Sequence, residues 1–169
     1  KVFLTQLEIR TEVTLHALKL AKKGNAITIL NPAPAIEIND EFFKYIDFFT
    51  PNETEAEFYY GKKIENYDQA KLAGDFFLKK GIKNSIITLG DKGAYFTNHK
   101  KNFSVPALDL KGKVLDTTGA GDAFSGALAS GLEKKMLIED CLKFAIKVSG
   151  ISTTKNGAAD AMPWFKELI

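Results

Sequence analysis

The 169-residue sequence has one cysteine and two histidines, so it lacks the side chains that several common kinds of site require. Cys141 has no second cysteine with which to form a disulfide, and its helix-spaced apolar neighbours predict a buried packing role. His16 and His99 lie far apart in the sequence, and no Cys/His cluster has the spacing of a zinc site.

The sequence also lacks an excess of charge of either sign and a long apolar run. Its formal net charge is +2, and its lysines are scattered rather than interleaved with aromatic residues, which gives no electrostatic basis for nucleic-acid binding. No apolar run approaches the ~18 residues that a membrane-spanning helix needs, and no secretory signal pattern is visible. We therefore expect a cytoplasmic protein that binds neither nucleic acid nor a membrane.

The residues that are present are typical of a globular domain. Hydrophobic residues make up 45% of the chain and charged residues 26%, which suits one domain with a sizeable core. Short apolar runs alternate with segments of helical spacing, which predicts βαβ units and an α/β fold with a parallel sheet flanked by helices. The expected strands are 2–7, 26–30, 46–50 and 85–89, followed by a hairpin of 94–97 and 102–105, and the expected helices are 11–23, 42–45, 51–60, 67–80, 122–132, 137–152 and 163–169.

A polar residue or a glycine follows each expected strand of the parallel sheet. In parallel sheets the carboxyl ends of the strands meet at one edge, and ligands bind beyond that edge. The sequence therefore predicts a ligand site formed by the loops after the strands. The residues that mark these loops are Glu8, Asn31, Asn52, Gly90 and Gly119.

The most informative segment is the run from Asp116 to Leu128, which places two glycines and an acid at the expected start of a helix. Gly119 and Gly121 allow a tight turn and a close approach of a ligand to the main chain. Free N–H groups at the start of a helix, together with the helix dipole, favour an anion. Asp122 would repel that anion unless it accepts a proton, for instance from a hydroxyl that attacks a phosphate.

Other interpretations of this run are possible. A capped helix start, with Thr or Asp as the N-cap and glycine for the turn, explains the same residues without a ligand. A Walker A loop requires Gly-Lys-Ser/Thr, which is absent, and a dinucleotide fingerprint requires a third glycine where the chain has Phe124.

The spelling of residues 116–124, Asp-Thr-Thr-Gly-Ala-Gly-Asp-Ala-Phe, is similar to the C-terminal signature of the ribokinase family of carbohydrate kinases. Four further segments resemble the same family in the same order, and together the five span nearly the whole chain. They are Gln-Leu-Glu at 6–8, Leu-Asn-Pro-Ala-Pro at 30–34, Thr-Pro-Asn-Glu-Thr-Glu-Ala-Glu at 50–57 and Thr-Leu-Gly-Asp-Lys-Gly at 88–93. The second and third of these resemble ribokinase proper more than its fructokinase or nucleoside-kinase relatives.

This resemblance implies a Rossmann-like, ribokinase-like fold in which residues 1–169 form a single nucleotide-binding and catalytic part. The N-terminal half and lid of the family would then be absent, so we expect this chain alone to be inactive. The implied activity is ATP-dependent phosphorylation of a sugar hydroxyl, D-ribose to D-ribose 5-phosphate. A fructokinase, a nucleoside kinase or a non-catalytic nucleotide-binding fragment is the alternative, and a homodimer could form through the missing lid.

The resemblance also assigns roles to individual residues. Asp122 would be the general base, and the backbone N–H groups of Gly119, Ala120 and Gly121 would form an anion hole. Substrate contacts would come from Glu8 and from Asp122 itself.

The same resemblance implies ATP and Mg²⁺. Glu55 would hold Mg²⁺ through water, although Asn52 and Glu55 also have the spacing of a helix capping pair. Ile146 departs from the family, which often has Asn or His near the adenine edge. The implied ATP-binding residues are Asn52, Thr88, Gly90, Lys92, Gly93, Gly121 and Ile146.

A monovalent cation such as K⁺ is implied as well. Alkali cations take oxygen ligands, often backbone carbonyls, so the side chains need not be strict. Asp116 and Thr118 match one half of the family site, and Ala161 departs from it because the family often offers a hydroxyl there. The other half would consist of Ser152, Lys155, Gly157 and Ala161.

Overall fold

The computed structural model describes residues 1–168, which form two compact units. The first unit contains residues 1–90 and 94–104, and the second contains residues 91–93 and 105–168. None of the helices within residues 1–168 is both long enough and apolar enough to cross a membrane.

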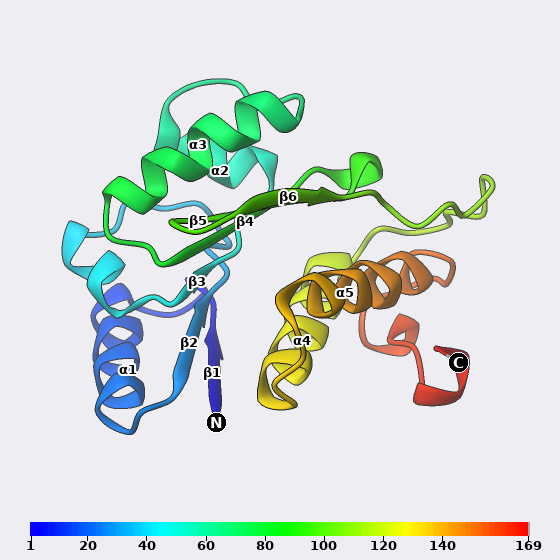
Figure 1. Cartoon of the computed structure of the whole chain (residues 1–169). Coiled ribbons are helices and arrows are strands. Elements are labelled where there is room, and N and C mark those ends of the chain that lie inside the picture. The colour runs from blue at the N-terminus through cyan, green and yellow to red at the C-terminus, as the bar shows by residue number, and fades with distance from the viewer. Residues whose placement is uncertain (169) are drawn as a thin grey trace. The chain divides into compact units, whose positions relative to one another are not determined.

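The first unit carries a six-stranded sheet whose strands lie side by side in chain order (Figure 1). The strands are β1 (Val2–Thr5), β2 (Ile27–Leu30), β3 (Phe48–Phe49), β4 (Asn84–Thr88), β5 (Ala94–Asn98) and β6 (Asn102–Val105). The helices of this unit are α1 (Thr11–Lys23), α2 (Glu53–Tyr60) and α3 (Tyr67–Lys79), and it also contains the 3-10 turn η1 (Asp40–Tyr45). The 3-10 turn η2 (Gly90–Lys92) begins in this unit, and its residues 91 and 92 belong to the second.

Strands β1 to β4 pair in parallel, and β5 then pairs antiparallel to β4. The registers place Leu30 opposite Phe49 and Thr88 opposite Ala94. The predicted α/β architecture is confirmed, and the predicted hairpin adds the antiparallel edge that makes the sheet mixed. Crossover helices connect the parallel strands, because such strands cannot be joined by a tight turn.

The core of the first unit lies on one face of the sheet. Leu18 of α1 and Phe77 of α3 belong to a single buried cluster with Leu30, Phe49 and Ile87 of the strands. Neighbouring strand residues that point to the other face, such as Ile29, are buried as well, and burial on both faces explains why the strands read as continuous apolar runs.

Helix α3 approaches the sheet closely at Gly74. A Cβ atom there would lie 2.3 Å from the Cγ2 atom of Thr97 on β5 and 3.9 Å from the Cβ atom of Ser85 on β4. Glycine at this position therefore sets how near the helix lies to the strands.

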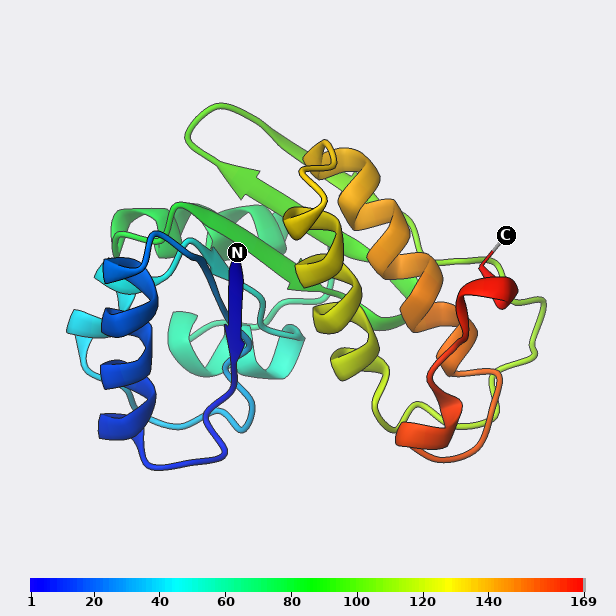
Figure 2. The same cartoon turned by 90° about the horizontal axis from the view of Figure 1, so that it is seen from below.

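The second unit is built on two helices that run side by side in opposite directions (Figure 2). They are α4 (Ala120–Glu133) and α5 (Ile138–Ser152), and two 3-10 turns follow, η3 (Ala159–Ala161) and η4 (Phe165–Glu167). A Cβ atom at Gly131 of α4 would lie 2.5 Å from the Sγ atom of Cys141 on α5. The absence of a side chain at Gly131 therefore lets the two helices pack closely. The predicted buried packing role of Cys141 is confirmed, and burial raises the pKa of its thiol to about 11.

The expectation of a helix over 163–169 is wrong for the residues described. Only the turn η4 forms there, and residue 169 lies outside the described residues. The Glu167 carboxylate turns back to accept the Trp164 N–H at 2.7 Å and pairs with Lys155 at 2.7 Å. These side-chain contacts fix the segment without the repeated backbone bonds of a helix.

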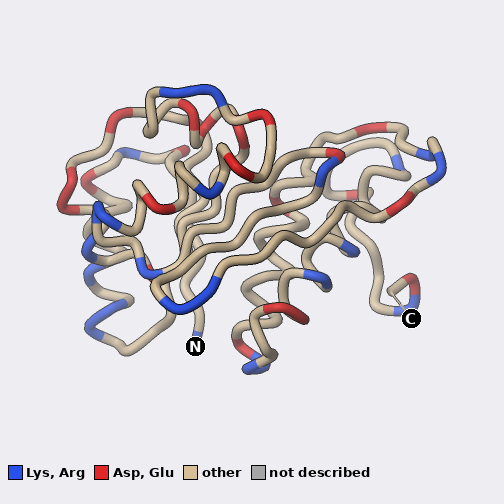
Figure 3. The backbone as a smooth tube through the Cα atoms, turned by 45° about the horizontal axis from the view of Figure 1, so that its top comes forward, with Lys and Arg blue, Asp and Glu red and all other residues tan. Residues whose placement is uncertain are grey.

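Basic and acidic residues are interspersed along both units (Figure 3), and Asp47 is one of the few that is buried. Its carboxylate accepts hydrogen bonds from Lys22 at 2.7 and 2.9 Å, from Lys83 at 2.8 Å and from the Thr28 N–H at 3.0 Å. Burial opposes ionisation, but these hydrogen bonds outweigh it and hold the Asp47 pKa below its ordinary value of 3.8. Asp47 thus ties β2, α1 and the start of β4 together, just before β3 begins. The predicted strand 46–50 is shorter in the structure and contains Phe48–Phe49.

We predict that Asp47→Asn lowers the free energy of unfolding at pH 7 by about 1.5–3 kcal/mol, because hydrogen bonds to a charged group are lost. A depressed pKa stabilises the fold above the unfolded pKa, and the contribution is lost as pH falls through the folded pKa. The difference between wild type and variant should therefore shrink below about pH 3.8. Urea unfolding at pH 7 and pH 3 measures both effects.

Asp40→Asn is the matched control, because the Asp40 side chain is 73% exposed in its ion pair with Lys80. Its effect should stay below about 1 kcal/mol at either pH. Equal losses of unfolding free energy in the two variants would show that the buried Asp47 cluster stabilises the fold no more than an exposed ion pair does.

Candidate active site

Helix α4 begins with a left-handed glycine and without a side-chain cap. Gly119 is the N-cap residue with φ 76°, and no side chain hydrogen-bonds to the first turn as a cap. The positive φ favours glycine at position 119, and a Cβ atom there would lie only 3.2 Å from the Cα and Cβ atoms of Ala158, a close contact. The interpretation of this run as a helix capped by Thr or Asp is therefore not what the structure shows.

The backbone donors of this helix start differ in availability. The Ala120 N–H donates to the Thr117 carbonyl at 3.1 Å, and the Ala123 N–H donates to the Gly119 carbonyl at 2.9 Å. The N–H groups of Gly119 and Gly121 have no acceptor within residues 1–168. Two of the three amides expected in an anion hole are thus available to a ligand.

Asp122 stands in the first turn of α4, one residue after Gly121, and its side chain is exposed. An ionised carboxylate is only an acceptor of hydrogen bonds, so it can receive a proton from a hydroxyl placed beside it. The structure thus puts a proton acceptor and two available N–H donors within one helical turn.

Asp116 joins the loop that enters α4 to the loop that leaves α5. One carboxylate oxygen accepts the Thr118 N–H at 2.9 Å, and the other accepts the Gly157 N–H at 2.9 Å. The Thr118 hydroxyl, and then the Thr118 and Gly157 N–H groups, hold the Asp116 pKa below its ordinary value. The Thr153 carbonyl adds to this junction by accepting the N–H groups of Leu115 and Asp116, at 2.8 and 3.2 Å.

The oxygen atoms at this junction are of the kind that a hard cation takes as ligands. Among the described residues, no backbone N–H donates to the carbonyls of Asp116, Thr118 or Gly157. Carbonyl and carboxylate oxygens are the ligands that hard cations take. The Lys155 ammonium pairs with Glu167, so only the backbone of Lys155 is open to such an ion.

The remaining residues assigned to that cation lie in the same part of the second unit. The Ser152 hydroxyl donates to the Ser149 carbonyl at 2.7 Å, and the Ser152 carbonyl accepts the Lys155 N–H at 3.2 Å. Ala161 is fully buried in the turn η3 and has no side-chain oxygen to offer.

In the first unit, Asn52 and Glu55 form a reciprocal cap at the start of α2. Asn52 Oδ1 accepts the Glu55 N–H at 2.8 Å, Glu55 Oε2 accepts the Asn52 N–H at 2.9 Å, and Asn52 Nδ2 donates to Glu55 Oε1 at 3.0 Å. Burial raises the Glu55 pKa, although the Asn52 N–H works against the rise. The capping alternative is thus present in the structure, and it leaves each carboxylate oxygen a further lone pair for a magnesium-bound water.

The structure brings two further predicted residues, Thr88 and Gly90, to the same end of the sheet as Asn52. Asn52 pairs with Thr88 in an isolated parallel bridge, and the Thr88 N–H donates to the Pro51 carbonyl at 3.0 Å. Gly90, with φ 51°, follows β4, and a Cβ atom there would lie 3.4 Å from Glu53 Oε1. The loops after β3 and β4 are therefore neighbours, as the parallel register requires.

Glu8 is exposed beyond β1, where the Leu7 N–H donates to the Ala33 carbonyl at 2.8 Å. The loops after β1 and β2 are thereby joined at the carboxyl ends of those strands. The structure adds no contact that would specify a substrate for Glu8.

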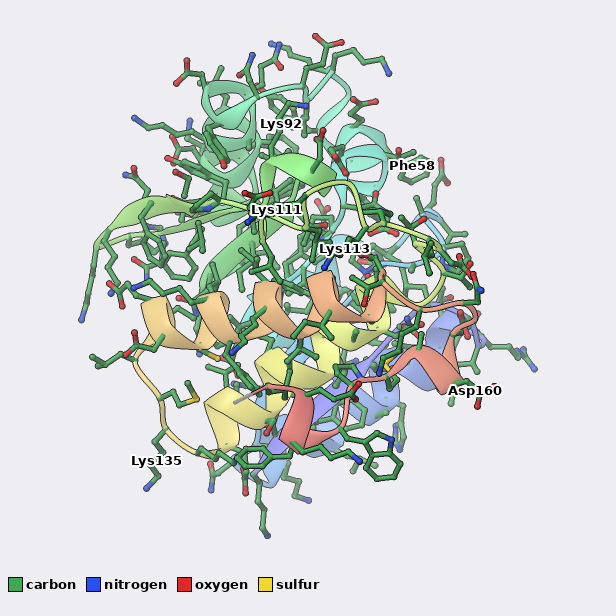
Figure 4. The ribbon with its side chains drawn as sticks, turned by 90° about the vertical axis from the view of Figure 1, so that its right-hand side faces the viewer. Phe58, Lys92, Lys111, Lys113, Lys135 and Asp160 are labelled. Atoms are coloured by element: carbon green, nitrogen blue, oxygen red, sulfur yellow. The ribbon has the colours of Figure 1, made fainter. Side chains whose placement is uncertain are left out.

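The other predicted nucleotide residues lie in the second unit. Lys92 is exposed in the turn η2 and lies 3.8 Å from Asp91 (Figure 4). Gly93 has φ 97°, and a Cβ atom there would lie 2.1 Å from the Val105 carbonyl oxygen. Ile146 is 9% exposed on α5. Within residues 1–168 no group of three or more His, Cys, Asp or Glu side chains could hold a metal by itself.

Sequence reasoning missed Ser149, whose hydroxyl on α5 donates to the Ala120 carbonyl of α4 at 2.8 Å. The only signal in the sequence is a row of hydroxyl residues near the end of that helix. A one-dimensional pattern does not show which of these hydroxyls reaches a second helix.

Comparison with known proteins agrees with this fold. Residues 2–164 match the pfkB family of carbohydrate kinases, and the chain belongs to that family.

Two of the most similar curated relatives are kinases of pentoses by name. A ribokinase of Staphylococcus aureus (strain COL) is 38% identical over 164 residues, which cover 96% of this chain and 53% of the relative. A deoxyribokinase of Salmonella typhi is 35% identical over the same shares of both chains. The chain thus spans about half the length of the curated relatives it matches.

Solved structures give the same result. The ribokinase of Arabidopsis thaliana complexed with ribose and ATP superposes with a TM-score of 0.94 at 30% identity, over 99% of this chain and 54% of that one. The ribokinase of Thermotoga maritima superposes with a TM-score of 0.88 at 36% identity, over 99% of this chain and 55% of that one. The expected membership of the ribokinase family and the expected fold are confirmed.

Proposed function

We propose that this chain is the nucleotide-binding and catalytic part of an ATP-dependent sugar kinase. The observation that carries the proposal is the start of α4, where the N–H groups of Gly119 and Gly121 have no acceptor within the described chain and Asp122 stands in the same turn. Helices α1 and α5 also begin without a side-chain cap. What distinguishes α4 from those two helices is the pair of glycines, the acid Asp122 and the junction around Asp116.

D-ribose, phosphorylated at its primary hydroxyl to D-ribose 5-phosphate, is the substrate we propose. The ribokinase names of the relatives and the ribose and ATP in the Arabidopsis complex support this sugar. Deoxyribose is a second candidate, because a deoxyribokinase is 35% identical to the chain.

In the proposed reaction, Asp122 accepts the proton of the sugar hydroxyl while its oxygen forms a bond to the γ-phosphorus of ATP. The bond from that phosphorus to the bridging oxygen breaks, and ADP leaves. The Gly119 and Gly121 N–H groups hydrogen-bond the charge that develops on the transferring group. For the bound nucleotide, we propose contacts with Asn52, Thr88, Gly90, Lys92, Gly93, Gly121 and Ile146.

Two cations belong to the proposal. The Glu55 carboxylate, which keeps open lone pairs, would hold the water shell of Mg²⁺, and that ion would supply positive charge to the nucleotide phosphates. A monovalent cation such as K⁺ would take oxygen atoms of the junction around Asp116 and deepen the positive potential near Gly119. Glu8 is proposed as a contact to the sugar.

We further propose that the part of the family length not spanned by this chain supplies the lid and most contacts to the sugar. Without them a kinase cannot position the sugar or exclude water, so this chain alone should transfer phosphate poorly. A homodimer through the lid and a cytoplasmic location stay predictions.

We predict that Asp122→Asn in the full-length kinase lowers kcat by about 10²–10⁴, because the amide keeps the shape of the side chain and loses its basicity. The KM for ATP should change little, since the backbone amides are retained. Initial rates of ribose phosphorylation measure both values.

Asp160→Asn is the matched control for that variant, because Asp160 is also an exposed carboxylate of the second unit (Figure 4). It should leave kcat at the wild-type value. Loss of a general base typically lowers the rate by about 10²–10⁴. If Asp122→Asn keeps more than about a tenth of wild-type kcat, its loss is too small for that role and Asp122 is not the base.

We predict that Glu55→Gln raises the Mg²⁺ concentration needed for half-maximal activity several-fold without lowering the melting temperature. Glutamine can serve in a capping box as glutamate does, but it carries no charge. The raised pKa of Glu55 also means that folding disfavours its ionised form, so a neutral side chain is not expected to destabilise the fold.

Glu55→Ala separates the two roles, since it removes both the cap and the charge. It should lower the melting temperature and raise the Mg²⁺ requirement. A magnesium titration of Glu55→Gln that superimposes on wild type would leave Glu55 with the capping role alone.

A further inference from the structure

Four hydroxyl side chains lie near the end of α5, and three of them bond within their own chain segment. Ser152, Thr153 and Thr154 each donate to the carbonyl three residues earlier, at 2.7, 2.8 and 2.7 Å. Ser149 differs, because its hydroxyl leaves the helix and donates to the Ala120 carbonyl of α4 at 2.8 Å. This contact therefore links α5 to the start of the neighbouring helix.

The Ala120 carbonyl belongs to the same peptide group as the Gly121 N–H. A peptide group is planar, so fixing the direction of its oxygen also fixes the direction of its N–H on the opposite side. A hydrogen bond accepted by the carbonyl also polarises the group and strengthens the N–H as a donor. The Ser149 hydroxyl thus acts on a donor that has no acceptor within the described residues.

This peptide group needs such support because its surroundings are permissive. Gly119 precedes Ala120 in the left-handed region, and Gly121 is exposed. Apart from its chain neighbours and the nearby backbone of α4, no described atom lies within 4 Å of where its Cβ would be. Glycine restricts the backbone less than any other residue. The N–H groups of the first turn of a helix have no intrahelical acceptor, so within α4 this peptide group can be bonded only through its carbonyl.

We propose that Ser149 is a positioning residue that holds the Gly121 N–H toward the transferring phosphoryl group. The proposal rests on the proposed kinase function, and it assigns to Ser149 no contact with ATP or sugar. A positioned donor contributes mainly in the transition state, where charge develops, so the effect should appear in kcat rather than in KM.

The test compares Ser149→Ala with Ser149→Thr in the full-length kinase. Ser149→Ala should lower kcat about tenfold, which is less than the ~10²–10³ seen when an oxyanion-hole donor is removed outright, because the Gly121 N–H itself remains. The KM values for ATP and ribose should stay within about twofold of wild type. Ser149→Thr restores a hydroxyl and should recover most of the lost kcat.

Thr154→Val is the matched control, because it removes a hydroxyl near the same helix end that bonds only to the Ile151 carbonyl. It should leave kcat unchanged. A loss of kcat in Thr154→Val as large as in Ser149→Ala would overturn the proposal, since any change near the end of α5 would then suffice.

A binding measurement supplies a second readout. Mg-ADP with aluminium fluoride and ribose mimics the transferring group, whereas Mg-ADP alone does not. Ser149→Ala should weaken binding of the first set about tenfold, matching the kcat effect, and leave binding of Mg-ADP unchanged. Equal affinities of variant and wild type for both sets would overturn the proposal even if the variant were less stable.

The outcome also separates this inference from the proposed function. If wild type phosphorylates no sugar, the kinase proposal and this one both fail. If wild type phosphorylates ribose and Ser149→Ala keeps full kcat, only the positioning role of Ser149 is wrong.

Discussion

The start of α4 imposes the constraint on which the second unit depends, because two of its backbone donors have no acceptor in the described chain. The first four N–H groups of a helix have no partner within the helix, so a side chain, water or a ligand has to accept them. At α2 the side chains of Asn52 and Glu55 meet this need. At α4 the Gly119 and Gly121 N–H groups are left for a ligand, and a phosphate oxygen satisfies them well.

The surroundings of α4 hold this unsatisfied turn in one geometry. Asp116 ties the entering loop to Gly157, and the Thr153 carbonyl accepts two N–H groups of that same loop. The Ser149 hydroxyl of α5 donates to the carbonyl of Ala120, the first residue of α4. An anion site of this kind depends on preorganisation, since donors already in place need no rearrangement when charge develops.

Much of this organisation could be predicted from the sequence, and the failures have physical reasons. Thr11–Lys23 was predicted to the residue, because its apolar spacing and the following Gly24 define the helix without help from the rest of the fold. The tail after Met162 was predicted wrongly, because Glu167 bonds to Trp164 and Lys155 instead of continuing a helix. Tertiary contacts of this kind leave no periodic signal.

In the candidate site, too, local sequence patterns could be predicted and tertiary contacts could not. The glycines and Asp122 could be found in the sequence because the chemistry requires those residue types in consecutive positions. The Ser149 contact could not, because a hydroxyl in a helix more often bonds to its own backbone, as Ser152 does. The spacing of Asn52 and Glu55 is compatible with a cap or with ligand binding, and in the structure the cap leaves open lone pairs on Glu55.

The central claim is that the N–H groups of Gly119 and Gly121 bind the phosphate of a nucleotide. Amide proton and nitrogen chemical shifts of these two glycines, followed while Mg-ADP is added to the full-length protein, test it most directly. We expect large downfield shifts of both amides that saturate with nucleotide binding, while the amide of Gly61, the C-cap residue of α2, stays unchanged. Saturated nucleotide binding with no shift at Gly119 and Gly121 would contradict it.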